Sequence, residues 1–208
     1  MLATLAQFKT RYAIAGTAED TLITQVLTGV TAQLVVAAGR VYDGRPCLER
    51  GSLTVLLDVP EPYTRALWLP AWPVVSITSV KEALYGDFAS ASALVENTDY
   101  QLRRGTGRLS RIGFWLVGEQ TVQMICVAGY TPPSEYLAEG YTQGAGEVLL
   151  PDDILEAALQ QAGFVHSRRD QLGLTATSVQ GGSVSAYAQD KLLPGVAETM
   201  GRYARMAG

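Results

Sequence analysis

The chain has 208 residues, of which 48% are hydrophobic and 17% charged, a composition typical of a folded globular protein. This length excludes a large multidomain enzyme and fits one compact domain with appendages. The net charge of −4 argues against a protein whose main task is to grip nucleic acid over a wide basic face.

The sequence has no sign of export or of a membrane. The first residues lack a leading charge followed by a long apolar core, and no run reaches about 18 uninterrupted apolar residues. Cys47 and Cys126 lie outside any CxxC pair, so they predict ordinary buried or loop thiols. We therefore expect a protein that is made and kept in a reducing cytoplasm, with neither signal peptide nor membrane span.

Two helices are predicted within residues 1–39. In the first, Leu5, Phe8 and Tyr12 recur at helical spacing. The second follows a capping-box-like start, in which the Thr17 hydroxyl can accept an early backbone N–H. Its apolar stripe is wide enough to face more than one partner.

A β region is predicted over residues 52–130, after a loop at 40–51 that is rich in Asp, Gly and Pro. The region consists of short runs of β-branched and aromatic residues separated by turn formers. These runs are 53–57, 66–69, 74–80, 100–103, 109–112 and 121–127. The glycines at 105 and 107 predict a hairpin between two of them.

The C-terminal third begins with an exposed loop at 131–147 that is rich in Pro and Gly. A core helix follows over residues 150–172, opened by Pro and two Asp residues that favour a helix start. Residues 173–208 predict a flexible linker and a C-terminal arm with a last short helix. The predicted fold class is α+β: a helical bundle of the N-terminal pair and one helix from the C-terminal half, with an inserted antiparallel β region and an extended C-terminal arm.

The inventory of reactive side chains predicts no enzyme, no cofactor and no metal. The one histidine, His166, lies near a helix end and is interpreted as solvated, and no nucleophile motif or phosphate-binding glycine loop occurs. Acidic residues from Glu135 to Glu156 do not have the spacing of a calcium loop. A small carboxylate-based hydrolase that uses Glu135, Glu139 or Asp152 stays open as an alternative.

Four arginines on the predicted hairpin form a candidate basic patch: Arg103, Arg104, Arg108 and Arg111. Such a patch could touch DNA phosphates or pair with an acidic surface of a neighbouring subunit, and the alternative is a solvated hairpin. The large aromatic residues of the β region are interpreted as core or sheet-packing residues. They are Tyr63, Trp68, Trp72, Phe114 and Trp115.

The order of the pieces resembles the head-tail connector (adaptor, head completion) family of tailed bacteriophages over nearly the whole chain. Four segments carry the resemblance: LPAWPVVSITSV at 69–80, VAGYTPP at 127–133, LLPDDILEAA at 149–158 and LLPGVAETMGRYARM at 192–206. The β region is longer than the smallest, helical members of the family.

The resemblance implies a structural virion protein of the neck that is made in the host cytoplasm. It implies a ring of usually twelve copies under the portal, which extends the DNA channel and links the capsid to a stopper, head-closure or tail protein. Packaged double-stranded DNA would be a non-specific neighbour. By position, portal contact is expected at Leu192, Leu193, Pro194, Tyr203 and Arg205. Another neck component, a head-closure or tail-terminator protein, is the alternative and would predict hexamers or a small barrel.

Overall fold

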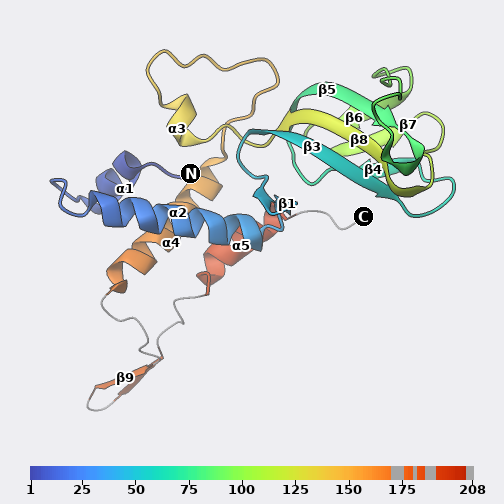
Figure 1. The fold of residues 1–208 in the computed structure, drawn as a ribbon. Coiled ribbons are helices and arrows are strands. Elements are labelled where there is room, and N and C mark those ends of the chain that lie inside the picture. The colour runs from blue at the N-terminus through green and yellow to red at the C-terminus, as the bar shows by residue number, and fades with distance from the viewer. Residues whose placement is uncertain (170–175, 180–181, 186–190, 205–208) are drawn as a thin grey trace. The chain divides into compact units, whose positions relative to one another are not determined.

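The computed structural model describes residues 1–169, 176–179, 182–185 and 191–204 (Figure 1). Helices and antiparallel sheets occur in it together, which confirms the predicted α+β class. The chain divides into two compact units, where the sequence predicts one compact domain with appendages. Unit 1 combines residues 1–38 with the described part of 151–204, and unit 2 contains residues 39–150. Each unit has buried apolar residues of its own, which is the physical reason for the division.

Unit 1 is a bundle of four helices. They are α1 (Leu5–Tyr12), α2 (Asp20–Ala37), α4 (Asp152–Ser167) and α5 (Pro194–Arg202). The bundle core comes from apolar residues at helical spacing, such as Ile23 and Leu27 of α2 and Ile154 of α4, all at most 2% exposed. The predicted helical bundle is thus present, with one more helix than expected inside it.

The capping of the first two helices differs from the prediction. Thr4 and Gln7 form a capping box at the start of α1, in which each side chain bonds to the backbone of the other. The helix α2 begins at Asp20 without a side-chain cap, and Thr17 contributes only its carbonyl oxygen, 3.2 Å from the Asp20 nitrogen. The predicted Thr17 cap is therefore wrong.

The helix α1 lies against α4 at a glycine. The Tyr12 hydroxyl donates a 3.0 Å hydrogen bond to the Leu159 carbonyl oxygen. A Cβ atom on Gly163 would lie 2.0 Å from the same hydroxyl oxygen. The absence of a side chain at this position is what lets the Tyr12 ring rest on α4.

The C-terminal segment differs from the expected extended arm over its described residues. The helix α5 packs in the bundle through Val196 and Met200, which are one turn apart and at most 1% exposed. Part of the predicted linker also has regular structure, because β9 (Ala176–Val179) and β10 (Gly182–Ser185) pair as an antiparallel hairpin. Thr and Val in this segment favour extended backbone, although the composition of the segment as a whole is typical of a flexible linker.

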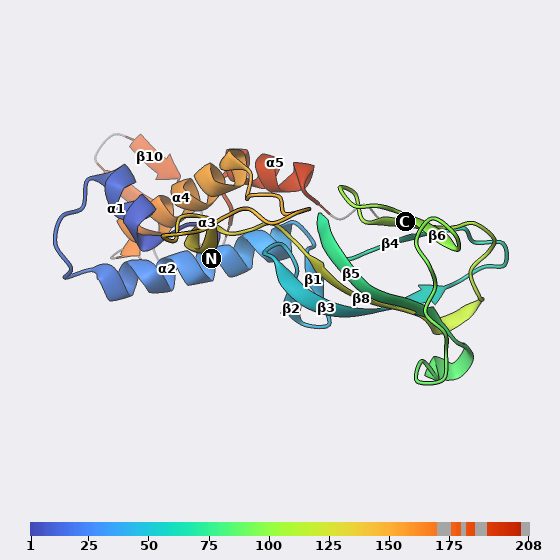
Figure 2. The same ribbon diagram turned by 90° about the horizontal axis from the view of Figure 1, so that it is seen from above.

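Unit 2 consists of two antiparallel three-stranded sheets (Figure 2). One sheet has the order β3-β8-β5, and the other has the order β4-β7-β6. The strands are β3 (Gly51–Val59), β4 (Ala66–Trp68), β5 (Val74–Glu82), β6 (Tyr100–Arg103), β7 (Arg108–Arg111) and β8 (Gly118–Ala128). Both sheets contribute to one apolar core, for example Val55 and Met124 from the first and Leu109 from the second. All six predicted strands are present within a few residues of their expected bounds.

Four short elements complete unit 2. The strands β1 (Val41–Tyr42) and β2 (Arg45–Pro46) pair where the sequence predicts a loop, because Asp43 and Gly44 both have positive φ, as a tight hairpin turn requires. The 3-10 helix η1 (Leu84–Gly86) follows β5, and the short helix α3 (Pro133–Tyr136) lies within the predicted exposed loop.

A fully buried arginine, Arg40, lies near the start of unit 2. The Arg40 guanidinium lies 3.5 Å from the Trp72 ring centroid and donates to the carbonyl oxygens of Cys47 and Trp72. Burial lowers the pKa of Arg40 to about 10. The two cysteines are free and buried, and burial raises the pKa of Cys126 to about 11.

Candidate functional site

The helix α2 has a wide uncovered face. Its 18 residues carry one charge, Asp20, and only 28% of them are buried in the structure. The exposed residues are small or uncharged: Thr21, Gln25, Thr28, Gly29, Ala32, Gln33, Val36 and Ala37. A helix facing water ordinarily carries charged residues on its outer side, so this face has the composition of a contact surface.

By length and composition alone, α2 could also cross a membrane, with a mean hydropathy of 1.3. The core helix of a water-soluble protein passes the same test. Here the buried residues Ile23, Leu27, Val30 and Leu34 recur every three or four residues along one side of α2. This stripe gives the helix a buried side in the bundle and leaves the opposite side uncovered.

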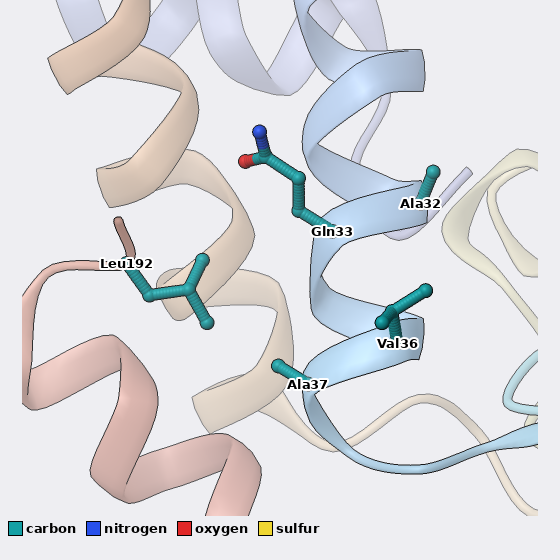
Figure 3. Close-up of a pocket in the computed structure, with 5 residues that line it drawn as sticks. All are labelled: Ala32, Gln33, Val36, Ala37 and Leu192. Carbon is teal, nitrogen blue, oxygen red and sulfur yellow. The ribbon is translucent and has the colours of Figure 1, made fainter. Parts of the chain in front are cut away.

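An apolar groove of about 450 Å³ lies beside this face (Figure 3). It is lined by Ala32, Gln33, Val36 and Ala37 of α2 and by Leu192, which precedes α5. Figure 3 shows Gln33 and Ala37 on the side of α2 that faces Leu192. The groove thus joins the exposed face of α2 to one of the residues expected to contact the portal.

A buried glutamine fixes the segment that leads into α5. Gln161 of α4 is fully buried, accepts a 3.0 Å hydrogen bond from the Leu193 backbone nitrogen and donates to the Lys191 carbonyl oxygen. Pro194 is the first residue of α5, where a missing backbone N–H has no consequence. Sequence reasoning missed Gln161, whose place on an otherwise apolar helix stripe was the available signal.

Tyr203, which is also expected to contact the portal, directly follows α5. The Tyr203 hydroxyl donates a 2.8 Å hydrogen bond to Asp153 Oδ1, which attaches the end of α5 to the start of α4. Arg205 lies outside the described residues. Leu192, Leu193, Pro194 and Tyr203 therefore all belong to one compact unit.

The arginine patch is largely neutralised within unit 2. Arg104 binds both carboxylate oxygens of Glu96, at 2.9 and 3.2 Å. Arg111 lies 3.4 Å from Glu82 and 3.6 Å from Asp99. These carboxylates come from β5 and from the segment just before β6, outside the hairpin on which the arginines lie.

The remaining two arginines of the patch differ from each other. The guanidinium carbon of Arg108 lies 5.9 Å from the Trp68 ring centroid, and its Nε is buried with no hydrogen-bond partner among the described residues. Arg103 pairs with Arg108 across the β6–β7 ladder and is exposed. The surface charge that the patch can offer to a phosphate or a carboxylate therefore comes mainly from Arg103.

The acidic stretch does not gather into a metal-binding cluster among the described residues. Arg50, the residue before strand β3, forms ion pairs with Glu135 and with Glu147, which tie the loop at 131–150 to the start of that strand. Glu147 also accepts hydrogen bonds from the Tyr141 hydroxyl and the Gly144 backbone, at 2.8 and 3.1 Å. These carboxylates hold the loop in place.

Two interpretations of single side chains are wrong. His166 is not solvated: its side chain is 12% exposed, and its Nε2 lies 3.1 Å from Glu19 Oε2. Among the aromatic residues, Trp115 is buried as expected, but Tyr63 and Phe114 are 78% and 47% exposed. Their rings pack against each other on the surface of unit 2, with centroids 5.2 Å apart.

Comparison with known proteins gives a likeness of fold. No protein-family model and no curated protein matches the chain. The chain is similar to one in the solved neck of an empty GTA (gene transfer agent) particle computed with C6 symmetry, with 15% identity and a TM-score of 0.57 over 98% of this chain and 90% of that one. It is also similar to one in the neck of a native GTA particle computed with C12 symmetry, with 14% identity and a TM-score of 0.56 over 98% and 89%. This likeness shows the fold, and it agrees with the resemblance to head-tail connectors.

Proposed function

We propose that this protein is a structural component of the neck of a tailed phage or phage-like particle. As a head-tail connector it forms a ring of twelve copies under the portal, extends the DNA channel, and links the capsid to a stopper or tail protein. It is made in the host cytoplasm, acts in the virion neck and has no catalytic role.

The likeness of fold supports the proposed place of the protein in the neck of a particle. It spans 98% of this chain, including both units, and the neighbouring structures come from the necks of particles computed with C6 and C12 symmetry. A ring with such symmetry needs each copy to present two different surfaces to its neighbours. The C12 structure is the reason for proposing twelve copies.

The observation that carries the proposal is the uncovered face of α2. Val36 is 66% exposed, and the residues around it on the face are uncharged. Exposing such a face to water gives up the hydrophobic stabilisation that burial against another surface would provide. Its small residues allow a neighbouring helix to approach closely, so we assign this face to contact between copies in the ring.

The C-terminal segment supplies the proposed contact with the portal. Leu192 lines the groove beside α2, and Leu193, Pro194 and Tyr203 follow it on the same unit. Arg205 belongs to the proposal through sequence resemblance alone. For the DNA channel or for contact between subunits, Arg103 is the exposed member of the arginine patch, while Arg104 and Arg111 already bind carboxylates of this chain.

Electron microscopy of the purified protein mixed with portal-bearing capsids tests the proposal, together with the mass of the protein in solution. We expect a ring of added density under the portal. A protein that neither forms rings alone nor binds these capsids would refute it.

Two substitutions test the assigned surfaces. Val36→Asp places a charge on the α2 face, and we expect at least about tenfold less ring assembly at equal concentration. The matched control is Leu84→Asp in unit 2, at a position 49% exposed, which should assemble normally. Leu192→Asp should weaken capsid binding. Deletion of α5 is unsuitable, because it would also remove the buried Val196 and Met200 from the bundle.

A further inference from the structure

Unit 2 displays an aromatic platform, formed by Tyr63, Arg65 and Phe114, on two adjacent loops. Tyr63 is 78% exposed and has a φ of +67°, a backbone conformation that a bulky residue rarely adopts. Phe114 is 47% exposed and meets the Tyr63 ring edge to face, at an interplanar angle of 80°. Strain combined with exposed aromatic area is typical of a recognition surface.

The aromatic platform is held rigidly. The Arg65 carbonyl oxygen accepts hydrogen bonds from the Arg111 backbone nitrogen at 2.7 Å and from Trp115 Nε1 at 3.0 Å. The Trp115 backbone nitrogen donates to the Thr64 carbonyl oxygen at 2.9 Å, and the Trp115 side chain is 2% exposed beneath. Because the two loops are fixed before any partner arrives, binding loses little conformational entropy.

The charge of the aromatic platform selects its partner. The Arg65 guanidinium carbon lies 4.7 Å from the Phe114 ring centroid, and Arg65 forms no ion pair with any residue that the structure describes. Asp58 near the end of β3 and Glu61 in the loop that follows are exposed within five residues of Tyr63 in the chain, and they would repel a phosphate backbone. A protein surface that offers apolar contact and a carboxylate is therefore favoured over a nucleic acid.

Such a surface occurs on this chain itself, in the acidic loop at 131–150. Leu137 is 57% exposed, and the nearby Glu139 is exposed and unpaired within the described part of the chain. Glu135 and Glu147 are held by Arg50, which leaves Glu139 as the carboxylate available to a partner. The acidic loop thus has both features that the platform requires.

The two surfaces lie at opposite ends of the same strand. Phe114 precedes the first residue of β8, Gly118, and the acidic loop follows its last residue, Ala128. Eleven extended residues span about 36 Å. The platform and the acidic loop of one chain are thus too far apart to meet, whereas those of two successive copies can.

We infer that the aromatic platform of one copy binds the acidic loop of the next copy in the ring, with Arg65 paired to Glu139. The inference rests on the proposed ring. It gives unit 2 a role in assembly: two unlike surfaces in contact form a head-to-tail interface, which closes into a ring when repeated.

A reciprocal charge swap tests this contact. Ring assembly is measured by mass photometry over a range of concentrations and by co-sedimentation with portal-bearing capsids, for Arg65→Glu, Glu139→Arg and the double variant. We expect each single variant to need about tenfold more protein to assemble, and the double variant to recover most of the loss. Arg45→Glu, at another exposed arginine without an ion pair in the described chain, is the matched control and should assemble normally.

Tyr63→Ala provides a second measurement that does not depend on charge, and it should weaken assembly in the same way. Circular dichroism confirms that each variant is folded. If the wild-type chain forms rings and both charge reversals leave them unchanged, or if the double variant does not recover, the contact is wrong while the proposed function stands. A wild-type chain without rings, alone or on capsids, refutes both. Binding to DNA that Tyr63→Ala abolishes, with rings unaffected, also refutes the contact.

Discussion

Substitution of Gly163 by alanine should destabilise unit 1, although alanine is the better helix former. The new Cβ would lie 2.0 Å from the Tyr12 hydroxyl oxygen and 2.3 Å from its Cζ, so the Tyr12 ring must leave α4. The change removes a hydrogen bond to Leu159, worth about 1 kcal/mol, and the ring contact with Phe8 at 4.7 Å, also worth about 1 kcal/mol. Replacing glycine by alanine within a helix stabilises the helix by about 1 kcal/mol. The expected net decrease in the free energy of unfolding is about 1 kcal/mol.

A double-mutant cycle with Tyr12→Ala isolates the cause. Tyr12→Ala removes the three atoms nearest to the new Cβ, so in that background Gly163→Ala should stabilise the bundle by about 1 kcal/mol, which reverses the sign of its effect. Gly29→Ala in α2 is the matched control, because a Cβ there meets no atom within 4 Å, and it should stabilise in either background. The measurement is urea unfolding followed by far-ultraviolet circular dichroism. The reasoning is refuted if Gly163→Ala stabilises the otherwise unchanged protein, or destabilises it equally without Tyr12.

Three further predictions concern other contacts. Arg50→Gln should release the loop at 131–150 and raise hydrogen exchange at Gly144 roughly tenfold, whereas Arg45→Gln should not; unchanged exchange would contradict the role of the ion pairs. Gln161→Leu leaves the Lys191 carbonyl oxygen and the Leu193 backbone nitrogen without their partner, which should cost about 1–3 kcal/mol of stability. Trypsin should therefore cleave faster after Lys191, and an equal cleavage rate would contradict the role of Gln161. Burial raises the pKa of Tyr12 above its usual 10.0, so its contribution to stability is complete below that pH and is lost as pH rises through the folded-state pKa. Urea midpoints measured from about pH 9 to about pH 11 should therefore fall less steeply for Tyr12→Phe than for the wild type.

The regular elements could be predicted because their signals are local. The six strands of the two larger sheets in unit 2 stand out as runs of β-branched residues between turn formers, and the helices follow the spacing of apolar residues. The short hairpin at Asp43 and Gly44 was also readable from this dipeptide, but its flanking strands of two residues give no periodic pattern.

The surfaces could not be predicted in the same way, because exposure and pairing depend on distant segments. Glu82 binds Arg111, which lies 29 residues further along the chain, and no local pattern in the sequence indicates this pair. Tyr63 and Trp115 are both large aromatic residues in the β region, yet one is 78% exposed and the other 2%. Only the packing of the two sheets distinguishes them. The candidate site was therefore partly visible in sequence, at Leu192 to Pro194, while the α2 face and the aromatic platform needed the structure.

The division of unit 1 between the two ends of the chain affects the order in which the protein can fold on the ribosome. The helices α1 and α2 are made first, but their bundle partner α4 is made only after all of residues 39–150. At roughly 5–20 residues per second, this leaves them without that partner for several seconds. Unit 2 can complete its own core within that interval. The apolar residues of α2 are thus uncovered in the nascent chain, and this period is when a chaperone would have most to protect.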